Sequence, residues 1–320
     1  MLDIYFYEVF EEEERAIKKY LPDEISAGFT WKTIQESGDT AMPAKLISIR
    51  TQSTIPLDWA KDLKGILSRS EGYDHILQYR KDSGVAVNFK HLDNYCSRAV
   101  AEHAVLIMMC LLRKLKAQIK NFDGFHRDGL TGMECNGKKA LVVGVGKIGS
   151  EIVDCLLGLK MEVKGVDIEP KDKRVEYVTL KEGLKEANVV FSALPLTEDT
   201  NKMFTIAAFE NAKQGIVLVN ISRGEITPVK DVKTMLDRGT LGGVGLDVYC
   251  CEKELADYLR GHVKEASDDV KMFCELKNRE NVIFTPHNAF NTVEAVEEKS
   301  KAKRRSCGEV CKGRKERIEC

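Results

Sequence analysis

The sequence predicts an α/β protein of two domains, each built on a parallel β-sheet with helices on both faces. Three observations support this fold class. The length of 320 residues is that of about two ordinary domains. Short apolar runs of strand length alternate with stretches of helical periodicity. These runs are apolar throughout, which is typical of parallel strands that are buried on both faces.

The first part of the chain contains four apolar runs, which we expect as strands over residues 3–8, 45–50, 64–68 and 85–89. Between the first two, residues 11–21 place Ala16, Ile17 and Leu21 on one face of a helix. Ser97 can cap a long apolar helix over residues 97–115. This helix is too interrupted for a membrane span, so we interpret it as a buried connecting helix.

The pattern is clearest in the second part of the chain. Helical segments separate six expected strands, over residues 139–144, 161–167, 188–194, 215–221, 241–248 and 281–286. Strands this apolar, joined by helices, favour a parallel sheet covered on both faces. The charged residues 254–280 interrupt the pattern, and we expect a helical insertion there.

Composition narrows the class of partners. The net charge of −1 gives no overall attraction to nucleic acid or to a membrane surface. The N-terminal residues lack the basic region of a secretory signal, and no apolar run approaches the roughly 20 residues of a membrane helix. The ten cysteines lack the paired spacing of a zinc site. Several, such as Cys110 and Cys155, lie among apolar residues. We therefore expect no bound metal and a reducing cytoplasm.

A glycine-rich turn follows the strand expected at residues 139–144. Gly144, Gly146 and Gly149 have the spacing G-x-G-x-x-G between an apolar strand and a helix. In a dinucleotide-binding turn, the first glycine permits the tight turn, the second lets the backbone approach a pyrophosphate, and the third allows close packing of helix and strand. Lys147 and Ile148 open the helix whose amides would face the anion. A tight turn without a ligand remains the alternative.

An acidic residue, Asp167, follows roughly 20 residues later at the end of the next expected strand. A carboxylate there can accept hydrogen bonds from the adenosine ribose. Together with Glu169 it would repel the additional phosphate of NADP. We therefore expect NAD as the cofactor.

Polar side chains follow three later strands of the same expected sheet: Arg223, then Asp247 and Glu252, and finally His287. Ligands of open parallel sheets bind outside the carboxyl ends of the strands, so these groups should lie at the same edge as the glycine turn. Each one alone could be a surface charge or a turn residue. Their shared position after consecutive strands favours a single site.

Several ordered motifs, GVGKIG, LPLTEDT, NISRGEI, GLDVYCCE and TPHNAF, resemble those of the D-isomer specific 2-hydroxyacid dehydrogenase family, in its D-lactate dehydrogenase-like branch. Upstream, SRSEGYDHI and YCSRAVAEHA are similar to that family's substrate loop and hinge helix. The resemblance implies a Rossmann NAD-binding domain over residues 97–290. It would be inserted in a flavodoxin-like substrate domain formed by residues 1–96 and 291–320. It also implies a homodimer assembled through the NAD-binding domain.

The resemblance further implies a role for each matching position. His287 corresponds to the general acid/base, Glu252 to the carboxylate that orients it, and Arg223 to the arginine that binds the substrate. Asp247 corresponds to the acid that holds the nicotinamide carboxamide. The other matching positions are Ser70, Glu71, Gly72 and Tyr95 for the substrate, and Pro195 and Thr200 for the adenosine.

These residue types suit the reduction of a 2-oxo acid. Hydride transfer builds negative charge on the carbonyl oxygen, which needs a proton donor and an electrostatic partner. An imidazole, which titrates near pH 6.5, can supply the proton, and a guanidinium matches a carboxylate with two parallel hydrogen bonds. We therefore expect an NAD-dependent enzyme that interconverts small 2-oxo acids and (R)-2-hydroxy acids. An NAD(H)-sensing regulator of the corepressor type is the alternative.

Two features depart from the family pattern. Cys250 and Cys251 directly precede Glu252, and we interpret them as packing residues, with a redox switch as the alternative. The C-terminal tail is more basic than the closing helix usual in the family, and it places Cys307 and Cys311 one helical turn apart. We expect a solvated terminus there. His75, His103 and His262 receive no role.

Overall fold

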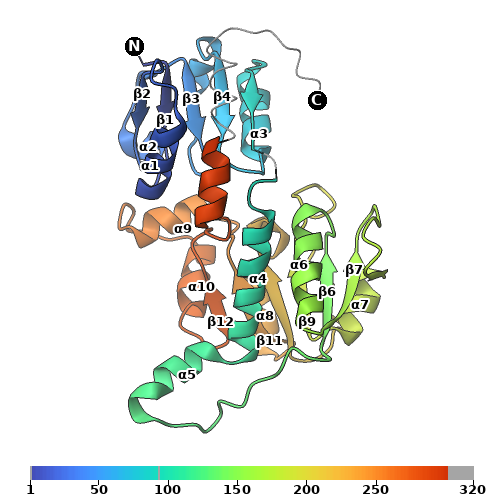
Figure 1. Ribbon diagram of the computed structural model, residues 1–320. Coiled ribbons are helices and arrows are strands. Elements are labelled where there is room, and N and C mark those ends of the chain that lie inside the picture. Colours follow the sequence, from blue (N-terminus) through green and yellow to red (C-terminus); the bar gives the residue numbers. More distant parts are fainter. Residues whose placement is uncertain (1, 93, 302–320) are drawn as a thin grey trace. The chain divides into compact units, whose positions relative to one another are not determined.

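The computed structural model describes residues 2–92 and 94–301, and the chain divides into two compact units (Figure 1). The small unit contains Met1–Tyr95 and the residues from Asn291 on, and the large unit is Cys96–Phe290. Each unit has its own sheet of parallel strands. The expectation for Cys307 and Cys311 lies outside the described residues.

The small unit has a five-stranded sheet in the order β2-β1-β3-β4-β5, which is the flavodoxin-like order. Three of the four expected strands form where they were placed, whereas β5 follows residues 85–88. No sequence pattern predicted β2, because this edge strand is three residues long and only partly buried. The bounds are β1 (Ile4–Phe6), β2 (Ala27–Phe29), β3 (Leu46–Ile49), β4 (Gly65–Ser68) and β5 (Phe89–Lys90).

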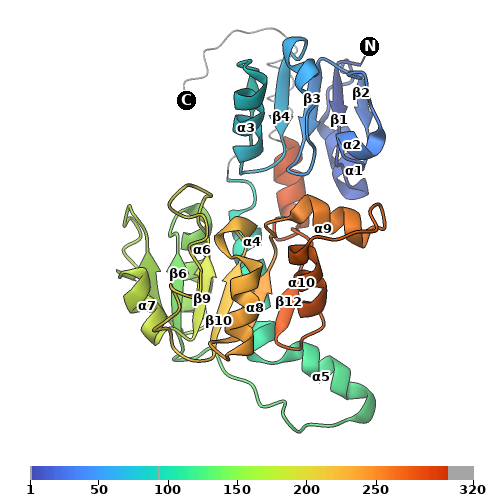
Figure 2. The ribbon, with the colours of Figure 1, turned by 180° about the vertical axis from the view of Figure 1, so that it is seen from behind.

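Helices cover both faces of this sheet (Figure 2). On one face, Ile17 of α1 (Glu11–Tyr20) packs with Ile4 and Phe6 of β1. Residues 293–301 are helical and lie beside α1, where Glu297 accepts hydrogen bonds from Lys19 (2.9 Å) and Tyr20 (2.6 Å). The elements of the other face are α2 (Ile34–Ser37), η1 (Leu57–Lys61) and α3 (Asp74–Ser83).

The large unit has a seven-stranded sheet in the order β12-β11-β10-β9-β6-β7-β8. This is the doubly wound order of a Rossmann fold, extended by one further strand at β12. All six expected strands are present, and the two-residue edge strand β8 is an addition. The bounds are β6 (Lys139–Val143), β7 (Glu162–Val166), β8 (Glu176–Tyr177), β9 (Val189–Ser192), β10 (Ile216–Asn220), β11 (Leu241–Leu246) and β12 (Val282–Phe284).

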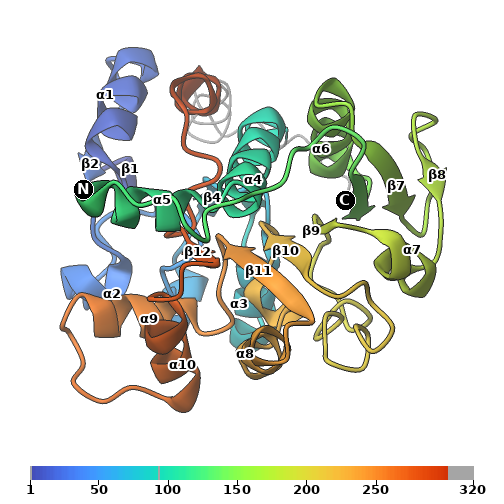
Figure 3. The ribbon, with the colours of Figure 1, turned by 90° about the horizontal axis from the view of Figure 1, so that it is seen from below.

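The helices α4 (Ser97–Leu112) and α6 (Lys147–Gly158) lie on one face of this sheet, and α7 (Leu180–Glu186), α8 (Val229–Asp237) and α10 (Asp268–Leu276) on the other (Figure 3). Glycine brings α4 close to the sheet, because a Cβ at Gly245 would lie 2.0 Å from the side chain of Ile107. The core between the sheet and the second face contains Leu141, Leu218 and Phe273.

The connecting helix is shorter than expected. It ends at Leu112, because Lys114 adopts a left-handed conformation (φ 52°) and the chain turns into α5 (Leu115–Asn121) and η2 (Phe122–Gly124). The charged stretch expected as an insertion forms α9 (Glu252–Leu259) and α10. Within the described part of the chain, no helix is long and apolar enough to cross a bilayer.

Candidate active site

The glycine turn between β6 and α6 has the geometry that its sequence predicts. Gly144 has a φ of +89°, and a Cβ there would lie 2.6 Å from the carbonyl oxygen of Ala193. At Gly149 a Cβ would lie 1.9 Å from the carbonyl oxygen of Gly144. Both positions therefore require glycine, one for the turn and one for the approach of helix to strand.

Gly146 differs, because a Cβ built there meets no heavy atom within 4 Å. Open space therefore lies over the N-terminus of α6, where Lys147 and Ile148 open the first turn. No side chain caps this helix, and its first turn contains no acidic residue. Backbone amides and the positive end of the helix dipole thus face a space that can accept a pyrophosphate. The residues of the turn fit NAD.

Asp167 lies at the carboxyl end of β7, beside the same turn. Its carboxylate accepts hydrogen bonds from the backbone N–H of Val145 (2.7 Å) and of Glu169 (2.9 Å). The acid is therefore fixed next to the first glycine of the turn. Ribose recognition by this carboxylate stays a prediction.

The loops that follow β10, β11 and β12 are tied to one another. A Cβ at Gly224 would lie 2.0 Å from the carbonyl carbon of Tyr249, so the loop after β10 packs directly on the loop after β11. The hydroxyl of Tyr249 donates to the carbonyl of Thr285 at the end of β12 (2.8 Å). Burial raises the pKa of this phenol, so it remains a neutral donor. Arg223, Glu252 and His287 belong to these three loops.

His287 and Glu252 form the central polar pair of the site. The Nδ1 atom of His287 lies 2.8 Å from Oε2 and 3.0 Å from Oε1 of Glu252. Their side chains are 24% and 23% exposed, so both remain accessible. Because the carboxylate occupies Nδ1, Nε2 is the nitrogen that can exchange a proton with a ligand.

The backbone aims the imidazole. The N–H of His287 donates to the carbonyl of Thr285 (2.9 Å), which closes a three-residue turn around Pro286. His287 then has a φ of +51°, a left-handed conformation that is uncommon for a residue other than glycine. Such strained positions concentrate at functional sites, where the surrounding structure holds them.

Asp247 stabilises this turn through hydrogen bonds. Its buried carboxylate accepts hydrogen bonds from the backbone N–H of Asn288 and Ala289 (both 2.9 Å) and from the hydroxyl of Thr285 (2.5 Å). His103 of α4 lies within 3.1 Å of the same hydroxyl. The sequence analysis assigned no role to Thr285 or His103, although both lie within motifs that it singled out, TPHNAF and YCSRAVAEHA. The expected contact of Asp247 with the nicotinamide stays a prediction.

Arg223 directly precedes η3 (Gly224–Ile226), and its Nη1 donates to the carbonyl of Ser222 (2.8 Å). Asn220, a fully buried residue at the end of β10, shapes this loop. Its side-chain amide donates to the carbonyl of Arg223 (2.8 Å) and to Thr227 (2.9 Å). Sequence reasoning missed Asn220, although a polar residue that ends an apolar strand was a usable signal.

The remaining cofactor residues lie in the loop after β9. The hydroxyl of Thr200 donates to the carbonyl of Pro195 (2.6 Å) and accepts from the N–H of Thr197 (2.8 Å). These bonds close the loop on itself, so Thr200 holds its shape. Contact of this loop with adenosine stays a prediction.

The expected substrate residues Ser70, Glu71, Gly72 and Tyr95 all belong to the small unit. Ser70 donates to the carbonyl of Gly72 (2.7 Å), so its side chain shapes the turn after β4. The hydroxyl of Tyr95 donates to the carbonyl of Arg69 (3.3 Å), directly before Ser70. The structure thus brings Tyr95 to the base of the Ser70–Gly72 loop.

Cys250 and Cys251 are partly buried. The thiol of Cys250 lies 3.7 Å from a carboxylate oxygen of Asp269 and hydrogen-bonds to Cys251. This hydrogen bond raises the pKa of Cys250 and lowers that of Cys251. Burial opposes the formation of a thiolate at both positions.

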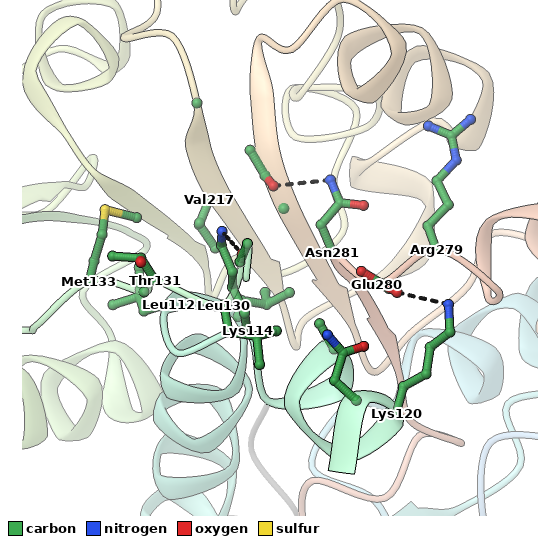
Figure 4. Close-up of a pocket in the computed structure, with 18 of the residues that line it drawn as sticks. Leu112, Lys114, Lys120, Leu130, Thr131, Met133, Val217, Arg279, Glu280 and Asn281 are labelled. Atoms are coloured by element: carbon green, nitrogen blue, oxygen red, sulfur yellow. Dashed lines mark hydrogen bonds and ion pairs between the residues drawn. The ribbon is translucent and has the colours of Figure 1, made fainter. Parts of the chain in front are cut away.

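A cavity of about 680 Å³ lies elsewhere in the large unit (Figure 4). It is lined by Gly215 and Asn281, which directly precede β10 and β12, by Gly242 near the start of β11, and by the end of α4 with the segment that follows it. The cavity is therefore at the amino-terminal edge of the sheet, and the glycine turn and His287 are at the carboxyl-terminal edge.

Comparison of the chain with known proteins identifies its family. The family model "D-isomer specific 2-hydroxyacid dehydrogenase, NAD binding domain" matches residues 105–289. The D-lactate dehydrogenase of Escherichia coli is 34% identical over 244 residues, covering 73% of this chain and 72% of the relative. The 2-hydroxyacid dehydrogenase A of Aspergillus oryzae is 36% identical over 247 residues, covering 75% and 70%.

Solved structures extend the similarity to both units. The D-lactate dehydrogenase of Aquifex aeolicus, solved with NAD and lactic acid, has a TM-score of 0.82 at 26% identity and covers 97% of this chain and 96% of its own. The apo enzyme of Escherichia coli has a TM-score of 0.83 at 26% identity and covers 98% of each chain. Nothing in these comparisons supports the NAD(H)-sensing regulator. The chain belongs to the D-isomer specific 2-hydroxyacid dehydrogenase family of NAD-dependent oxidoreductases.

Proposed function

We propose that the protein reduces a small 2-oxo acid to its (R)-2-hydroxy acid as a D-lactate dehydrogenase-like enzyme, with His287 as the general acid. The observation that carries this assignment is the pair of His287 and Glu252, 2.8 Å apart, at the sheet edge that also holds the glycine turn. When bound, NADH supplies the hydride. The names of the D-lactate dehydrogenases among the relatives and solved structures support the substrate class.

The proton moves at Nε2 of His287. Glu252 accepts from Nδ1, which fixes the tautomer and stabilises the imidazolium that donates the proton. In the oxidation of a 2-hydroxy acid, the neutral ring takes the hydroxyl proton at the same nitrogen. The left-handed turn and the hydrogen bonds that Asp247 accepts from the backbone after His287 keep the ring in place, so little reorganisation is needed at the moment of transfer.

This proposal assigns binding residues to each unit. Arg223 of the large unit offers two parallel N–H donors to the substrate's carboxylate and carbonyl oxygens. Ser70, Glu71 and Gly72 of the small unit receive the carboxylate through backbone amides, and Tyr95 stands beside them. Residues 97–290 would bind NAD, through the glycine turn, Asp167, Pro195, Thr200 and Asp247. Residues 1–96 and 291–320 would bind the substrate.

The proposal includes assembly into a homodimer through the NAD-binding unit. The segment of α5 and η2 projects from that unit (Figures 1 and 2). It carries Ile119, Phe122 and Phe125, which are 66%, 72% and 71% exposed. Apolar side chains exposed together mark interaction surfaces, and a second copy would bury them. Phe122→Asp with Phe125→Asp should convert a dimer into a monomer in light scattering, and an unchanged mass would contradict this assembly.

We also propose a cytoplasmic location. The seven cysteines within the described ranges carry free thiols, which suits a reducing compartment. Fractionation of the source cells tests this location.

Oxidation of NADH, followed by absorbance, tests the reaction with pyruvate, glyoxylate, hydroxypyruvate and branched 2-oxo acids. We expect turnover with at least one of them. In His287→Ala, turnover should fall by about 10²–10⁴-fold, the usual contribution of a general acid, while NADH still binds. Silence of the wild-type protein with every substrate, despite tight NADH binding, would refute the proposal. Wild-type turnover in His287→Ala would refute the role of this residue.

A further inference from the structure

Three charged side chains are buried together in the small unit. Glu13 comes from α1, Arg69 follows β4, and Lys299 belongs to the helical residues 293–301. Their exposed fractions are 0%, 0% and 1%. Removing charges from water is costly unless each charge finds close partners, so this cluster calls for an explanation.

One carboxylate serves both cations. Oε1 of Glu13 lies 2.9 Å from Nε of Arg69 and 2.5 Å from Nζ of Lys299. Arg69 also donates to the hydroxyl of Ser48 (3.1 Å) and to the carbonyls of Glu8 (2.9 Å) and Tyr7. Arg69 therefore has several acceptors in addition to Glu13. Lys299 is a second cation beside the carboxylate of Glu13, whose charge Arg69 already neutralises.

Lys299 is the weakly stabilised member of this cluster. Burial, aided by the positive charges of Arg50 and Arg69, lowers its pKa to about 7 against the attraction of Glu13. A neutral side chain would fill the same space without this cost. Packing alone therefore does not account for a lysine at this position.

The cluster is joined to the expected substrate loop. Arg69 directly precedes Ser70, and its own backbone is fixed on both sides. The N–H of Arg69 donates to the carbonyl of Ile49 (2.8 Å), and its carbonyl accepts from the hydroxyl of Tyr95 (3.3 Å). Nζ of Lys299 lies 5.9 Å from the centre of the Tyr95 ring, within range of a cation–π interaction. Lys299 thus contacts both the carboxylate that holds Arg69 and the aromatic ring beside the loop.

We propose that Lys299 is a positioning residue for substrate binding. Through Glu13 and the Tyr95 ring, it holds Arg69 and the Ser70–Gly72 loop in the arrangement that receives the substrate's carboxylate. The inference rests on the proposed function, because these residues meet the substrate only in that reaction. The positively charged ammonium group of Lys299 also lies in the same unit as the Ser70–Gly72 loop, which binds the negatively charged carboxylate of the substrate in the proposed reaction.

The first experiment compares Lys299→Met with Lys301→Met. Lys301 belongs to the same helical segment but is 49% exposed and pairs only with surface acids, so it is the matched control. In Lys299→Met we expect the KM for pyruvate, or for the best 2-oxo acid of the panel, to rise about tenfold (~1.4 kcal/mol). The kcat should change less than about twofold, and the Kd for NADH should stay constant.

The thermal midpoint separates positioning from a merely structural role. Lys299→Met removes a poorly stabilised buried charge and leaves Glu13 paired with Arg69, so its Tm should not fall. A fall in Tm with an unchanged KM, or a variant that does not fold, would assign Lys299 to stability and overturn the inference. An equal rise of KM in Lys301→Met would overturn it as well.

A second measurement needs no change at Lys299. The affinity for oxamate, an unreactive analogue of a 2-oxo acid, is measured against pH in His287→Gln, in which the catalytic imidazole no longer titrates. Lys299 is charged below about pH 7, with Glu13, Arg50, Arg69 and the Tyr95 ring facing it. Oxamate affinity should therefore fall as the pH rises through about 7, and this fall should be absent when Lys299→Met is added.

The outcomes keep the two proposals apart. A flat oxamate affinity in His287→Gln, or an unchanged KM in a folded Lys299→Met, overturns the role of Lys299 and leaves the dehydrogenase assignment intact. Failure of the wild-type protein to reduce any 2-oxo acid refutes the assignment itself, and oxamate binding still reports on Lys299 in that case.

Discussion

The two sheets present charged groups at their carboxyl-terminal edges in different ways. In the large unit, His287 and Glu252 pair with each other while about a quarter of each side chain stays exposed. In the small unit, Glu13 and Arg69 are fully buried, and Arg69 donates to several acceptors. A group that exchanges protons must remain accessible, whereas a group that holds a loop is most effective when buried and saturated with hydrogen bonds. The comparison therefore separates chemistry from positioning.

The edges also differ in how their loops are joined. In the large unit, the joints are close backbone packing at Gly224 and the hydrogen bonds of Tyr249 and Asp247. In the small unit, the buried ion cluster of Glu13, Arg69 and Lys299 connects the segments instead. Charged joints respond to pH and to the loss of one partner, so substitutions should affect the two edges differently.

The largest expected effect is on the stability of the small unit. Arg69→Met leaves the carbonyls of Tyr7 and Glu8 and the hydroxyl of Ser48 without this donor, and Glu13 loses this cation. We expect the free energy of unfolding to fall by about 3–5 kcal/mol, the usual result of breaking a buried ion pair. Denaturant unfolding measures this change. A loss below about 1 kcal/mol would show that the ion cluster does not stabilise the small unit and would contradict the contrast between the two sheet edges.

The next effect is on catalysis in the large unit. Glu252→Gln keeps the shape of the His287 partner but removes the charge that stabilises the imidazolium. We expect kcat to fall roughly 10- to 100-fold while the unfolding free energy changes by less than about 1 kcal/mol, because the pair is partly solvated. Steady-state kinetics and denaturant unfolding give the two values. A large loss of stability would make this pair a structural joint like that of the small unit.

The glycine turn offers a matched pair of substitutions. Gly146→Ala adds a methyl group in open space, so the fold should persist while the Kd for NADH rises about tenfold or more. Gly149→Ala places the methyl group against the carbonyl of Gly144, so it should lower the Tm. Fluorescence titration with NADH and thermal unfolding distinguish the two variants. An unchanged NADH affinity in Gly146→Ala would contradict the pyrophosphate assignment.

The last prediction concerns the dependence of stability on pH. The pKa of Lys299 is about 7 in the folded protein and 10.5 in the reference state. Between these values the unfolded chain binds more protons than the folded one, so stability rises with pH, by at most about 1.4 kcal/mol per pH unit. Subtracting the pH profile of Lys299→Met isolates this contribution. A difference that falls as the pH rises from 7 to 9 would contradict the burial of a strained cation.

The sequence predicted the large unit better than the small unit, for physical reasons. Strands such as β6 and β10 are apolar on both faces and end in glycine or polar residues, which leaves a clear signal. The edge strands β2 and β8 are short and partly exposed, so neither their length nor their apolarity marks them. The end of α4 was missed because Lys114 adopts the left-handed conformation there, and the glycine that usually marks such a helix end is absent from this position.

The strand ends predicted that His287 and Glu252 lie at one edge of a sheet, and the resemblance of their motifs to the family implied that they pair. The ion cluster was not predicted, because Glu13, Arg69 and Lys299 belong to three segments of the chain that no local pattern connects. Glu13 in particular stands in a run of four acidic residues that reads as a solvated helix surface. Only the packed fold distinguishes the buried glutamate from its exposed neighbours.

Residues 293–301 determine when the small unit can be completed during synthesis of the chain. The large unit is contiguous and can fold as soon as it leaves the ribosome, since domains generally fold as units during translation. The small unit contains residues from both sides of the large unit, so Glu13 meets its partner Lys299 only after the large unit has been made. A nascent chain would thus pass through a stage in which the first part of the small unit is still incomplete, and a chaperone that shields this part would have to hold it until residues 293–301 emerge.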